Sequence, residues 1–559
     1  MIDLAARARA WIANDTDSDT VSELTALLND EPALRERFSG PLEFGTAGLR
    51  GIIGAGESRM NAAVVITTTD ALCRVLEDKV IGAQDKGIVI GNDGRTKSTA
   101  FARAAAQIAA ARGFKVWLFD DYAPTPLTAY AVIASGAAAG IMVTASHNPP
   151  EYNGYKVYWG NGAQIISPVD AWVRDAAVRS VARGAKALLA DAEKSGKKWQ
   201  SAPQMWRDMY RSEVQRLRAY PNLRLNDMAI AYTPMHGVGA ATAIRLIEDE
   251  GIHVYAVREQ EQPDAAFPTV KFPNPEEPGA MDLVNALALR ENCDLSVAND
   301  PDADRLAIAV REGSAMRMLS GNQIGTMLGA YLLTAHQQRP ALVATSVVSS
   351  RALHALAAHH QAIYFETLTG FKWIANGAIS RAAQGEFLFG YEEALGFTVG
   401  TLVRDKDGIS AALVFCEMVA WLKASGRTVA DYEREIAGDI GVFASQQKSF
   451  TLKGADGLER MKQVMATLRA QPPQQVGNDK VATLRDYAKG GDLPPTDMVK
   501  LDFDRAQVIV RPSGTEPKLK LYAEASEAFS IGEDYDAAMA RANARCAALA
   551  GSLAKTLAL

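Results

Sequence analysis

The stretch Thr144-Ala145-Ser146-His147-Asn148-Pro149-Pro150 decides how the rest of this sequence is interpreted. It follows an apolar run over 137–143 that predicts a buried strand. Ser146 is therefore expected at the carboxyl end of that strand, where open α/β sheets place their ligands. The two prolines lack N–H donors and favour extended backbone before them, so the loop does not continue as a helix. Ser146 is a candidate nucleophile, although an isolated Ser-His pair more often caps a helix or a turn.

Lys156 is the first candidate partner of this serine. It comes shortly after Asn153-Gly154, a pair that is typical of hairpin turns. A turn at this point would fold the chain back and bring Lys156 beside Ser146. There its ammonium group would act as a positive charge or as a proton carrier.

Length and composition are those of a large globular protein. The 559 residues predict three to five domains, at about 100–200 residues each. The net charge of −6 is spread without long blocks of one sign, so nothing indicates nucleic acid or an anionic membrane as a partner. The four cysteines lie far apart without a Cys-x-x-Cys pair, which predicts buried thiols in a reducing cytoplasm.

Predicted strands and helices alternate in three successive cycles. Strands are expected over 87–91, 114–119 and 137–143, then over 227–232, 253–257 and 295–298, and then over 341–346, 362–366 and 386–390. This order implies largely parallel sheets. Near the end, 518–524 alternates polar and apolar residues, which is typical of a sheet with one solvated face. The fold class is therefore α/β, with three similar mixed α/β domains in series and a C-terminal α+β domain. The predicted ranges are a helical lead-in over 1–40 and domains over 41–205, 206–315, 316–450 and 451–559.

Asp300, Asp302 and Asp304 recur at every second residue just after a predicted strand. In extended backbone this spacing places three carboxylates on one side, where their mutual repulsion calls for a cation. Ligands that are all oxygen favour Mg²⁺ over zinc. An EF-hand calcium loop is excluded, because it needs Gly and Glu where this chain has Arg305 and Arg311. A solvated acidic turn remains the alternative.

Two later loops carry groups that suit a sugar phosphate. Glu392 and Glu393 follow a short predicted strand and offer carboxylates to sugar hydroxyls, although an exposed acidic turn explains them equally well. The other loop offers a guanidinium group, two hydroxyls and backbone N–H groups to a phosphate, although a plain β-turn is the alternative. Its residues are Arg511, Ser513, Gly514 and Thr515.

The four loops fall one in each predicted domain, and together they resemble the α-D-phosphohexomutase superfamily, the phosphoglucomutase/phosphomannomutase enzymes. TASHNPPEYNGYK at 144–156 resembles the phosphoserine loop and DPDADR at 300–305 the metal loop. GYEEALG at 390–396 resembles the sugar-binding loop, and RPSGTEPK at 511–518 the phosphate-binding loop. The resemblance covers nearly the whole chain after residue 40 and implies a four-domain, heart-shaped architecture.

The resemblance also implies a mechanism and its residues. Ser146 would carry a phosphoryl group, and one Mg²⁺ per subunit would be held by Ser146 and the three aspartates. The catalytic set would be Ser146, Lys156, His147 and Arg50. Substrate would be bound by Arg305, Thr369, Gly370, Lys372, Glu392, Glu393, Arg511, Ser513, Gly514 and Thr515. The activator and intermediate would be glucose 1,6-bisphosphate, and the partners would be small sugar phosphates, without nucleic acid or membrane.

Two departures from the family pattern bear on the choice of sugar. Ala394 stands where many members have Ser, and Phe371 where others carry His or Trp. With TGFKW at 369–373, these features resemble the phosphoglucomutase 2-like subgroup. The sequence predicts a cytoplasmic phosphoglucomutase, an isomerase of glucose metabolism that is a monomer or homodimer. Phosphomannomutase or phosphopentomutase activity, a glucose-1,6-bisphosphate synthase and a non-catalytic sugar-phosphate sensor are the alternatives.

Overall fold

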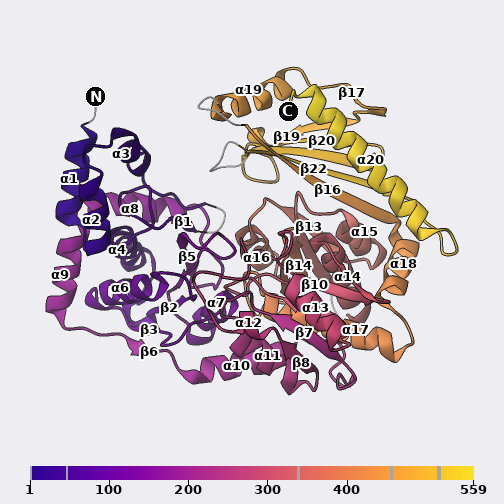
Figure 1. Cartoon of the computed structure of the whole chain (residues 1–559), viewed down its shortest axis with the longest axis horizontal. Helices are drawn as coiled ribbons and strands as arrows, with labels where there is room; N and C mark the ends of the chain where they lie inside the picture. Colours follow the sequence, from indigo (N-terminus) through magenta and orange to yellow (C-terminus); the bar gives the residue numbers. More distant parts are fainter. Residues whose placement is uncertain (1–2, 46–47, 337–339, 453–456, 513–517) are drawn as a thin grey trace. The chain divides into compact units, whose positions relative to one another are not determined.

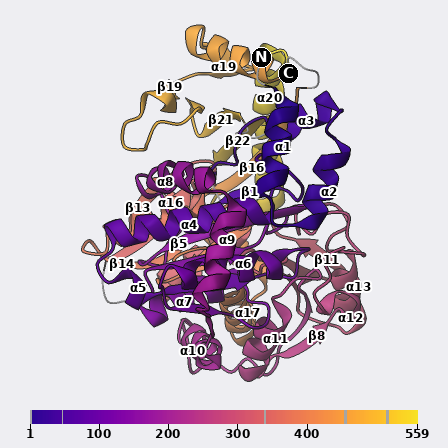
Figure 2. The ribbon, with the colours of Figure 1, turned by 90° about the vertical axis from the view of Figure 1, so that its left-hand side faces the viewer.

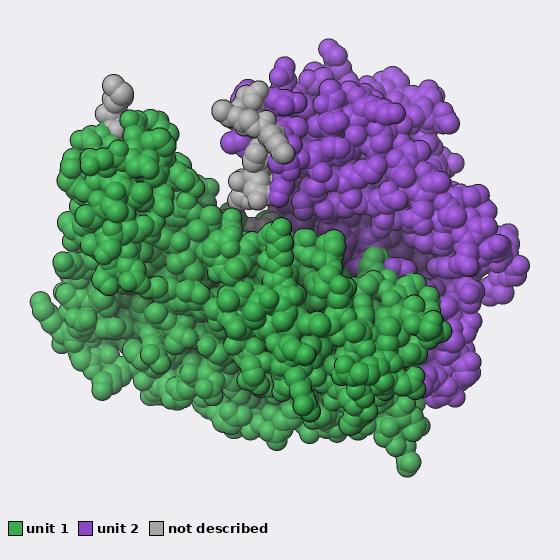
Figure 3. Space-filling model, viewed as in Figure 1, with its two compact units in different colours: residues 1–320, 370–380, 394–420 green, residues 321–369, 381–393, 421–559 purple. Residues whose placement is uncertain are grey.

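The computed structural model of this chain describes residues 3–45, 48–336, 340–452, 457–512 and 518–559. The chain divides into two compact units, which Figure 3 colours separately. Unit 1 comprises residues 1–320, 370–380 and 394–420, and unit 2 comprises 321–369, 381–393 and 421–559. Each unit is described by itself.

Unit 1 begins with three short helices that form the predicted helical lead-in: α1 (Leu4–Asn14), α2 (Ser18–Ala26) and α3 (Glu31–Arg37). An aspartate caps each of them, because its carboxylate accepts a backbone N–H that the first helical turn leaves without a partner. The three helices share a small core with the following loop, formed by Ala8, Leu24, Leu34, Phe38 and Ala55.

The first sheet carries the serine loop and has the strand order β1-β5-β4-β2-β3-β6. Its strands are β1 (Leu49–Ile52), β2 (Ile88–Asn92), β3 (Val116–Leu118), β4 (Ala139–Val143), β5 (Tyr152–Trp159) and β6 (Gln200–Ser201). β2 is parallel to β3 and β4, as the alternating pattern predicts, whereas β5 is antiparallel to both β4 and β1. β2 and β4 are buried along their whole length, which explains their unbroken apolar sequence.

Helices pack around this sheet and against one another. They are α4 (Ala62–Lys79), α5 (Ala83–Lys86), α6 (Ser98–Ala111), α7 (Thr125–Ser135), α8 (Val169–Arg183) and α9 (Ala185–Ser195). Figure 2 shows α4, α6 and α9 lying side by side. α7 packs on β2 and β4, and it leads into the strand before the serine loop.

The second sheet of unit 1 carries the aspartate loop and has the order β11-β10-β9-β7-β8. Its strands are β7 (Ala229–Thr233), β8 (His253–Ala256), β9 (Leu295–Ala298), β10 (Ala307–Glu312) and β11 (Ala315–Met318). The helices of this part are α10 (Gln204–Gln215), α11 (Ala240–Asp249), α12 (Arg258–Glu261) and α13 (Asp282–Arg290). Unit 1 also contains α16 (Phe371–Ser380), β15 (Gly396–Val399) and most of α17 (Gly408–Ala424).

Unit 2 contains a parallel sheet and an antiparallel sheet. The parallel strands lie in the order β13 (Ile363–Thr367), β12 (Ala341–Ser346) and β14 (Glu386–Glu392). The helices of this part are α14 (Gly321–Ala335), α15 (Ala352–His359) and α18 (Val429–Ile440). The antiparallel sheet β16-β22-β21-β20-β19 comprises Val442–Thr451, Lys518–Glu527, Ala506–Pro512, Val499–Phe503 and Thr483–Asp486. The long helix α20 (Tyr535–Thr556) packs across the antiparallel sheet (Figure 1). The same part of unit 2 contains α19 (Gly457–Ala470), a small hairpin of β17 (Gln475–Val476) and β18 (Asp479–Lys480), and a 3₁₀ turn at Tyr487–Lys489. This is the predicted α+β domain.

Two further expectations concern thiols and membranes. All four cysteines are free and buried, as predicted. Among the described residues, no single helix combines the length and apolar composition needed to cross a membrane, and only α17 taken together with α18 reaches them as a bent pair.

Candidate active site

Ser146 lies in a tight turn directly after β4, as predicted from the sequence. Its backbone has a φ of 53°, in the left-handed region that residues other than glycine seldom adopt. The Thr144 hydroxyl accepts the Ser146 N–H at 2.8 Å. The buried guanidinium group of Arg95 donates to the carbonyl oxygens of Ser146, Asn148 and Pro149. These contacts fix a strained backbone, a feature that proteins concentrate at functional sites.

The predicted hairpin at Asn153-Gly154 is wrong, because both residues lie inside strand β5. A side chain at Gly154 would approach the carbonyl oxygens of Thr144 and Leu49 to 2.6 and 2.7 Å. Glycine is therefore needed here because strands β4 and β1 flank β5 closely, and not because the chain turns. Lys156 belongs to the same strand and is fully buried.

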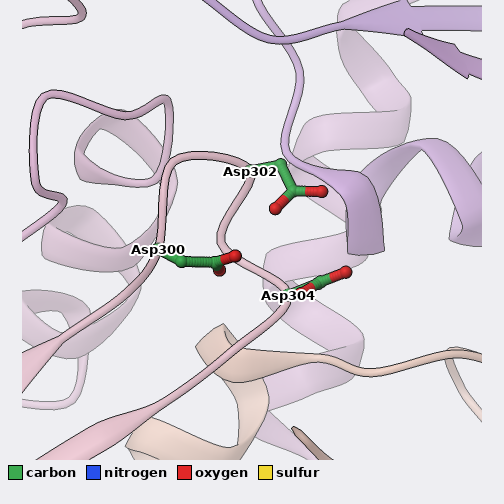
Figure 4. Close-up of side chains that lie close together, drawn as sticks. All are labelled: Asp300, Asp302 and Asp304. Carbon is green, nitrogen blue, oxygen red and sulfur yellow. The ribbon is translucent and has the colours of Figure 1, made fainter. Parts of the chain in front are cut away.

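The three aspartates converge, but not through the extended backbone that the sequence spacing predicted. Residues 301–303 form a turn between β9 and β10, in which Ala303 has a φ of 57°. Figure 4 shows the three side chains grouped around this turn, and one oxygen of each lies within 4.8 Å of the others. The loop ends are joined by Asn299, whose amide donates to the Arg305 carbonyl oxygen at 2.6 Å.

Serine and aspartates meet at a single place in unit 1. The Ser146 hydroxyl donates to Asp300 Oδ2 at 2.6 Å. Lys156 Nζ lies 2.8 Å from Asp302 Oδ2 and 2.7 Å from Asp304 Oδ2. Ser146 is 3% exposed, and the other four residues are fully buried. The structure therefore brings these five predicted residues together at one place.

The aspartate cluster also fits a hard divalent cation. Asp302 Oδ1 and Asp304 Oδ1 are buried and accept no hydrogen bond from the described residues. Orphaned carboxylate oxygens at such depth are costly unless a cation binds them. Since the Asp300 carboxylate and the Ser146 hydroxyl lie beside them, the set offers only oxygen ligands, as Mg²⁺ prefers.

The surroundings shift the pKa values of the aspartate carboxyl groups in different directions. Burial raises the pKa of Asp300 well above its usual range, and the neighbouring Asp302 and Asp304 add to the rise. Burial acts in the same direction on Asp304, but the Lys156 and Lys406 ammonium groups outweigh it and lower its pKa. Burial would lower the pKa of Lys156, yet its two carboxylate partners raise it overall. Lys156 is therefore held as a cation, which favours the predicted role as a positive charge over that of a proton carrier.

His147 and Arg50 flank the serine. His147 Nδ1 lies 3.2 Å from Ser146 Oγ, and its Nε2 lies 3.3 Å from a nitrogen of Arg305. Burial lowers the pKa of His147 well below its usual value, and Arg305 and Arg50 lower it further, so the ring is neutral near pH 7. Arg50 donates to the Asn148 side chain at 2.7 Å, and burial, assisted by Arg305, lowers its pKa to about 10.

Family models for phosphoglucomutase/phosphomannomutase match nearly the whole chain. The models of alpha/beta/alpha domains I, II and III match residues 41–181, 208–313 and 320–437, and the C-terminal domain model matches 463–542. The chain belongs to the phosphoglucomutase/phosphomannomutase family. It is thereby a member of the α-D-phosphohexomutase superfamily, with three α/β/α domains and a C-terminal domain.

Named relatives differ in the sugar that their names specify. A probable phosphomannomutase of Haemophilus influenzae is 40% identical over 475 residues, covering 83% of this chain and 93% of that protein. Human phosphopentomutase is 36% identical over 553 residues, covering 92% of this chain and 89% of that protein. A probable phosphoribomutase of Schizosaccharomyces pombe is 34% identical over 543 residues and covers 92% of both. A putative phosphomannomutase from Thermus thermophilus shares the fold, with a TM-score of 0.69 at 23% identity over 93% of this chain and 100% of that one.

The remaining predicted site residues of this phosphoglucomutase/phosphomannomutase family member lie in both units. In unit 1, Gly370 has a φ of 118° just before α16, and Lys372 Nζ donates to the Gly45 carbonyl oxygen at 3.0 Å. In unit 2, Thr369 is half-buried at the end of the loop after β13. Burial lowers the pKa of Lys372.

The predicted sugar-binding and phosphate-binding residues belong to unit 2. Glu393 accepts hydrogen bonds from the Ser349 and Ser346 hydroxyls at 3.0 and 3.2 Å, and Glu392 is 9% exposed. Arg511 lies near the end of β21 and hydrogen-bonds Tyr522, whose raised pKa comes mainly from burial and also from Glu393. Ser513, Gly514 and Thr515 lie outside the described residues.

Sequence reasoning did not indicate several residues that contact this cluster or the serine loop. Thr125 donates to Asp302 Oδ2 at 2.6 Å, and Lys406 Nζ lies 3.1 Å from Asp304. Arg95 holds the serine loop, although the sequence analysis left it without a role. One signal was available for Lys406: the compact charged stretch Arg404-Asp405-Lys406-Asp407 stands just before the apolar helix α17. Thr125 carries no comparable signal.

Proposed function

We propose that this chain is a phosphoglucomutase, which interconverts glucose 1-phosphate and glucose 6-phosphate through a phosphoserine at Ser146. The observation that carries the proposal is the 2.6 Å contact between Ser146 Oγ and Asp300 Oδ2, within a cluster of three buried carboxylates. A serine hydroxyl in this setting would lie beside a divalent cation held by these carboxylates. The cationic groups of Lys156 and Arg50 lie near the aspartates, and those of Arg305 and Arg50 lie near His147, the neighbour of the serine. Such charges stabilise the equatorial oxygens of a phosphoryl group in transfer.

The proposed reaction has two balanced halves. In the first, the bond between phosphorus and Ser146 Oγ breaks, a bond forms to the O6 hydroxyl of glucose 1-phosphate, and one proton passes from that hydroxyl to Oγ. In the second, Ser146 Oγ takes the phosphoryl group from O1 of glucose 1,6-bisphosphate, and one proton returns to O1. Mg²⁺, when bound by Ser146, Asp300, Asp302 and Asp304, supplies charge neutralisation.

The chain's own side chains divide the remaining work. His147, kept neutral by burial, has Nδ1 3.2 Å from Ser146 Oγ and exchanges the proton at that oxygen. Lys156 stays charged and holds Asp302 and Asp304 in place. Arg95 fixes the backbone of the serine turn through three carbonyl oxygens. Glu392 and Glu393 supply carboxylates for sugar hydroxyls, and Arg511 a guanidinium group for the phosphate.

Ser146→Ala tests this function. Turnover of glucose 1-phosphate, followed in a coupled assay with Mg²⁺ and a trace of glucose 1,6-bisphosphate, is expected to fall by at least about 10³-fold. Binding of the sugar phosphate is expected to change little, and phosphate should be absent from the peptide over 144–153 by mass spectrometry. Ser135→Ala is the matched control, because that hydroxyl contacts backbone groups at the end of α7, the Ala131 and Val132 carbonyl oxygens and the Ala137 N–H. Substantial turnover by Ser146→Ala would overturn the proposal.

A pentose phosphate is the second candidate substrate. Its support is the similarity to relatives named phosphopentomutase and phosphoribomutase, which extends over 92% of this chain. Ranking glucose 1-phosphate, mannose 1-phosphate and ribose 1-phosphate by kcat/KM separates the candidates. A preference for glucose or mannose phosphate supports a hexose mutase, whereas dominance of ribose phosphate makes the chain a pentomutase.

Two other roles remain alternatives on this site. A glucose-1,6-bisphosphate synthase requires an external acyl-phosphate donor and releases the bisphosphate, so dependence on such a donor would identify it. A sugar-phosphate sensor has no use for a phosphorylatable serine beside a cation site, and phosphorylation of Ser146 during turnover would exclude it.

A further inference from the structure

The start of the N-terminal helix α2 makes ion pairs with a segment that holds the serine loop. Lys97 Nζ lies 2.7 Å from Asp19 Oδ2 and 3.1 Å from Asp17 Oδ2, at the start of α2. Asp17 is also the capping residue of α2 and accepts the Asp19 N–H at 3.0 Å. The Lys97 and Asp17 side chains are 29% and 18% exposed, so this contact is partly shielded from solvent. The matched family models begin at residue 41, so this helix lies outside them.

Lys97 has an unusual backbone conformation at a sensitive position. Its φ of 65° lies in the left-handed region, and the residue stands immediately before α6 as its N-cap. No side chain caps the helix there, since the N-cap side chain points instead to the two aspartates. An L-residue with a long side chain is strained in this conformation and persists only where its surroundings hold it.

The residues on either side of Lys97 support the serine loop directly. The Asn153 amide donates to the Thr96 carbonyl oxygen and to the Ser98 hydroxyl, both at 2.9 Å. The Ser98 hydroxyl in turn donates to Asp93 Oδ1 at 2.6 Å, and Asp93 accepts the Arg95 N–H at 3.1 Å.

Arg95 closes this network on the serine side. Its guanidinium group donates to the carbonyl oxygens of Ser146, Asn148 and Pro149. The strained turn of Lys97 is therefore linked through a short chain of bonded contacts to the backbone of the proposed nucleophile. A change in the backbone at Lys97 displaces Thr96 and Ser98 and, through Asp93, the Arg95 side chain.

We propose that Asp17 and Asp19 are positioning residues for Ser146, because their ion pairs with Lys97 hold the left-handed turn that seats Arg95 beneath the serine loop. The inference rests on the proposed mutase function for its kinetic consequence only. Its structural consequence concerns the order of the loop over 144–153. The start of α2 thereby helps to position the serine loop.

Lys97→Ala and Lys97→Gly together form the decisive test. Both substitutions remove the ion pairs, but glycine adopts positive φ without strain, whereas alanine does not. Lys97→Ala and the double variant Asp17→Asn/Asp19→Asn are expected to lower kcat about tenfold with KM changed less than about twofold. Lys97→Gly is expected to keep at least about half of the wild-type kcat, and Lys97→Arg, which retains the charge, should do the same.

Amide hydrogen exchange measures the order of the serine loop directly and needs no substrate. Amide exchange over 144–153 is expected to accelerate in Lys97→Ala and in the double aspartate variant, and to stay near wild type in Lys97→Gly. Asp191→Asn is the matched control, since it removes the pair between Asp191 on α9 and Arg183 on α8, which lies outside this network.

Two results would overturn the inference: unchanged exchange over 144–153 in Lys97→Ala, or equal acceleration in the alanine and glycine variants. Failure of the wild-type protein to turn over any sugar phosphate, with the expected exchange pattern intact, would refute the proposed function and leave the loop assignment supported. The two failures are therefore distinguishable.

Discussion

Replacing Lys156 with methionine removes the ammonium group that lies between two buried carboxylates. The methionine side chain is of similar length and fills the same space, so packing changes little while the charge is lost. In the wild-type protein Lys156 Nζ contacts Asp302 at 2.8 Å and Asp304 at 2.7 Å, and none of the three residues is exposed. The substitution therefore isolates the electrostatic contribution of the lysine.

The magnitude follows from these distances. With an effective dielectric constant of about 20, each contact contributes roughly 6 kcal/mol of attraction, and desolvation of the three charges offsets most of the sum. Asp304 keeps Lys406 at 3.1 Å, so Asp302 is the carboxylate that loses most compensation. Removal of one partner from a buried pair costs about 3–5 kcal/mol of unfolding free energy. In a domain of roughly 150–250 residues, where 1 kcal/mol shifts the midpoint by about 2–4 °C, we expect a fall of about 6–20 °C in the thermal midpoint.

Thermal unfolding in EDTA and in excess MgCl₂ measures the effect. Because Mg²⁺ compensates the buried carboxylate charge that the substitution leaves without a partner, it should raise the midpoint of Lys156→Met by more than that of the wild type. Lys372→Met is the matched control: that lysine is also largely buried, but its hydrogen-bond acceptor is the Gly45 carbonyl oxygen rather than a carboxylate. Its midpoint should therefore respond to Mg²⁺ as the wild type does.

The reasoning would be refuted by a Lys156→Met midpoint in EDTA equal to that of the wild type. It would equally be refuted if Mg²⁺ stabilised the variant no more than the wild type, since the aspartates would then not share a site with the cation.

Three further predictions concern the aspartate loop. Asp302→Asn should abolish Mg²⁺ activation together with turnover in the coupled assay, and wild-type activation by Mg²⁺ would contradict the cation site. Asn299→Ala should weaken Mg²⁺ affinity by about 10–100-fold in titration calorimetry, because the Asn299 amide closes the loop onto the Arg305 carbonyl oxygen, and unchanged affinity would contradict this role. Asp300 has a raised folded pKa, caused first by burial, so its contribution to stability is full below the unfolded carboxyl pKa of about 3.9 and is lost as pH rises through the folded value. Metal-free protein should therefore lose stability as pH rises above the unfolded carboxyl value, and Asp300→Asn should reduce this dependence in thermal unfolding; an identical pH profile would count against it.

The serine loop shows where sequence reasoning succeeded for a partly wrong reason. The apolar run before Ser146 correctly predicted a buried strand, and this places the serine at the strand's carboxyl end. The same reasoning interpreted Asn153-Gly154 as a turn, because the pair is common in hairpins. Its glycine instead allows three strands to lie close together, and such a requirement depends on residues distant in sequence, here Leu49.

The partners of the aspartates show a second limit. Spacing alone indicated a cation site at Asp300, Asp302 and Asp304, since three carboxylates so close together repel one another. It did not indicate Thr125 or Lys406, because each reaches the cluster from a different element, the start of α7 and the segment before α17.

The sequence by itself determined which chemistry this chain carries: a serine after a strand, a triad of carboxylates, and the four loops that resemble one enzyme family. Local patterns suffice for this, because strand ends, turns and residue types are properties of neighbouring residues. The tertiary structure decided which groups are charged and how they are held. Burial and contacts between distant segments keep His147 neutral and Lys156 charged. They also leave two aspartate oxygens without a hydrogen-bond donor and place Arg95 against the backbone of the serine loop. Those quantities exist only once the chain has folded.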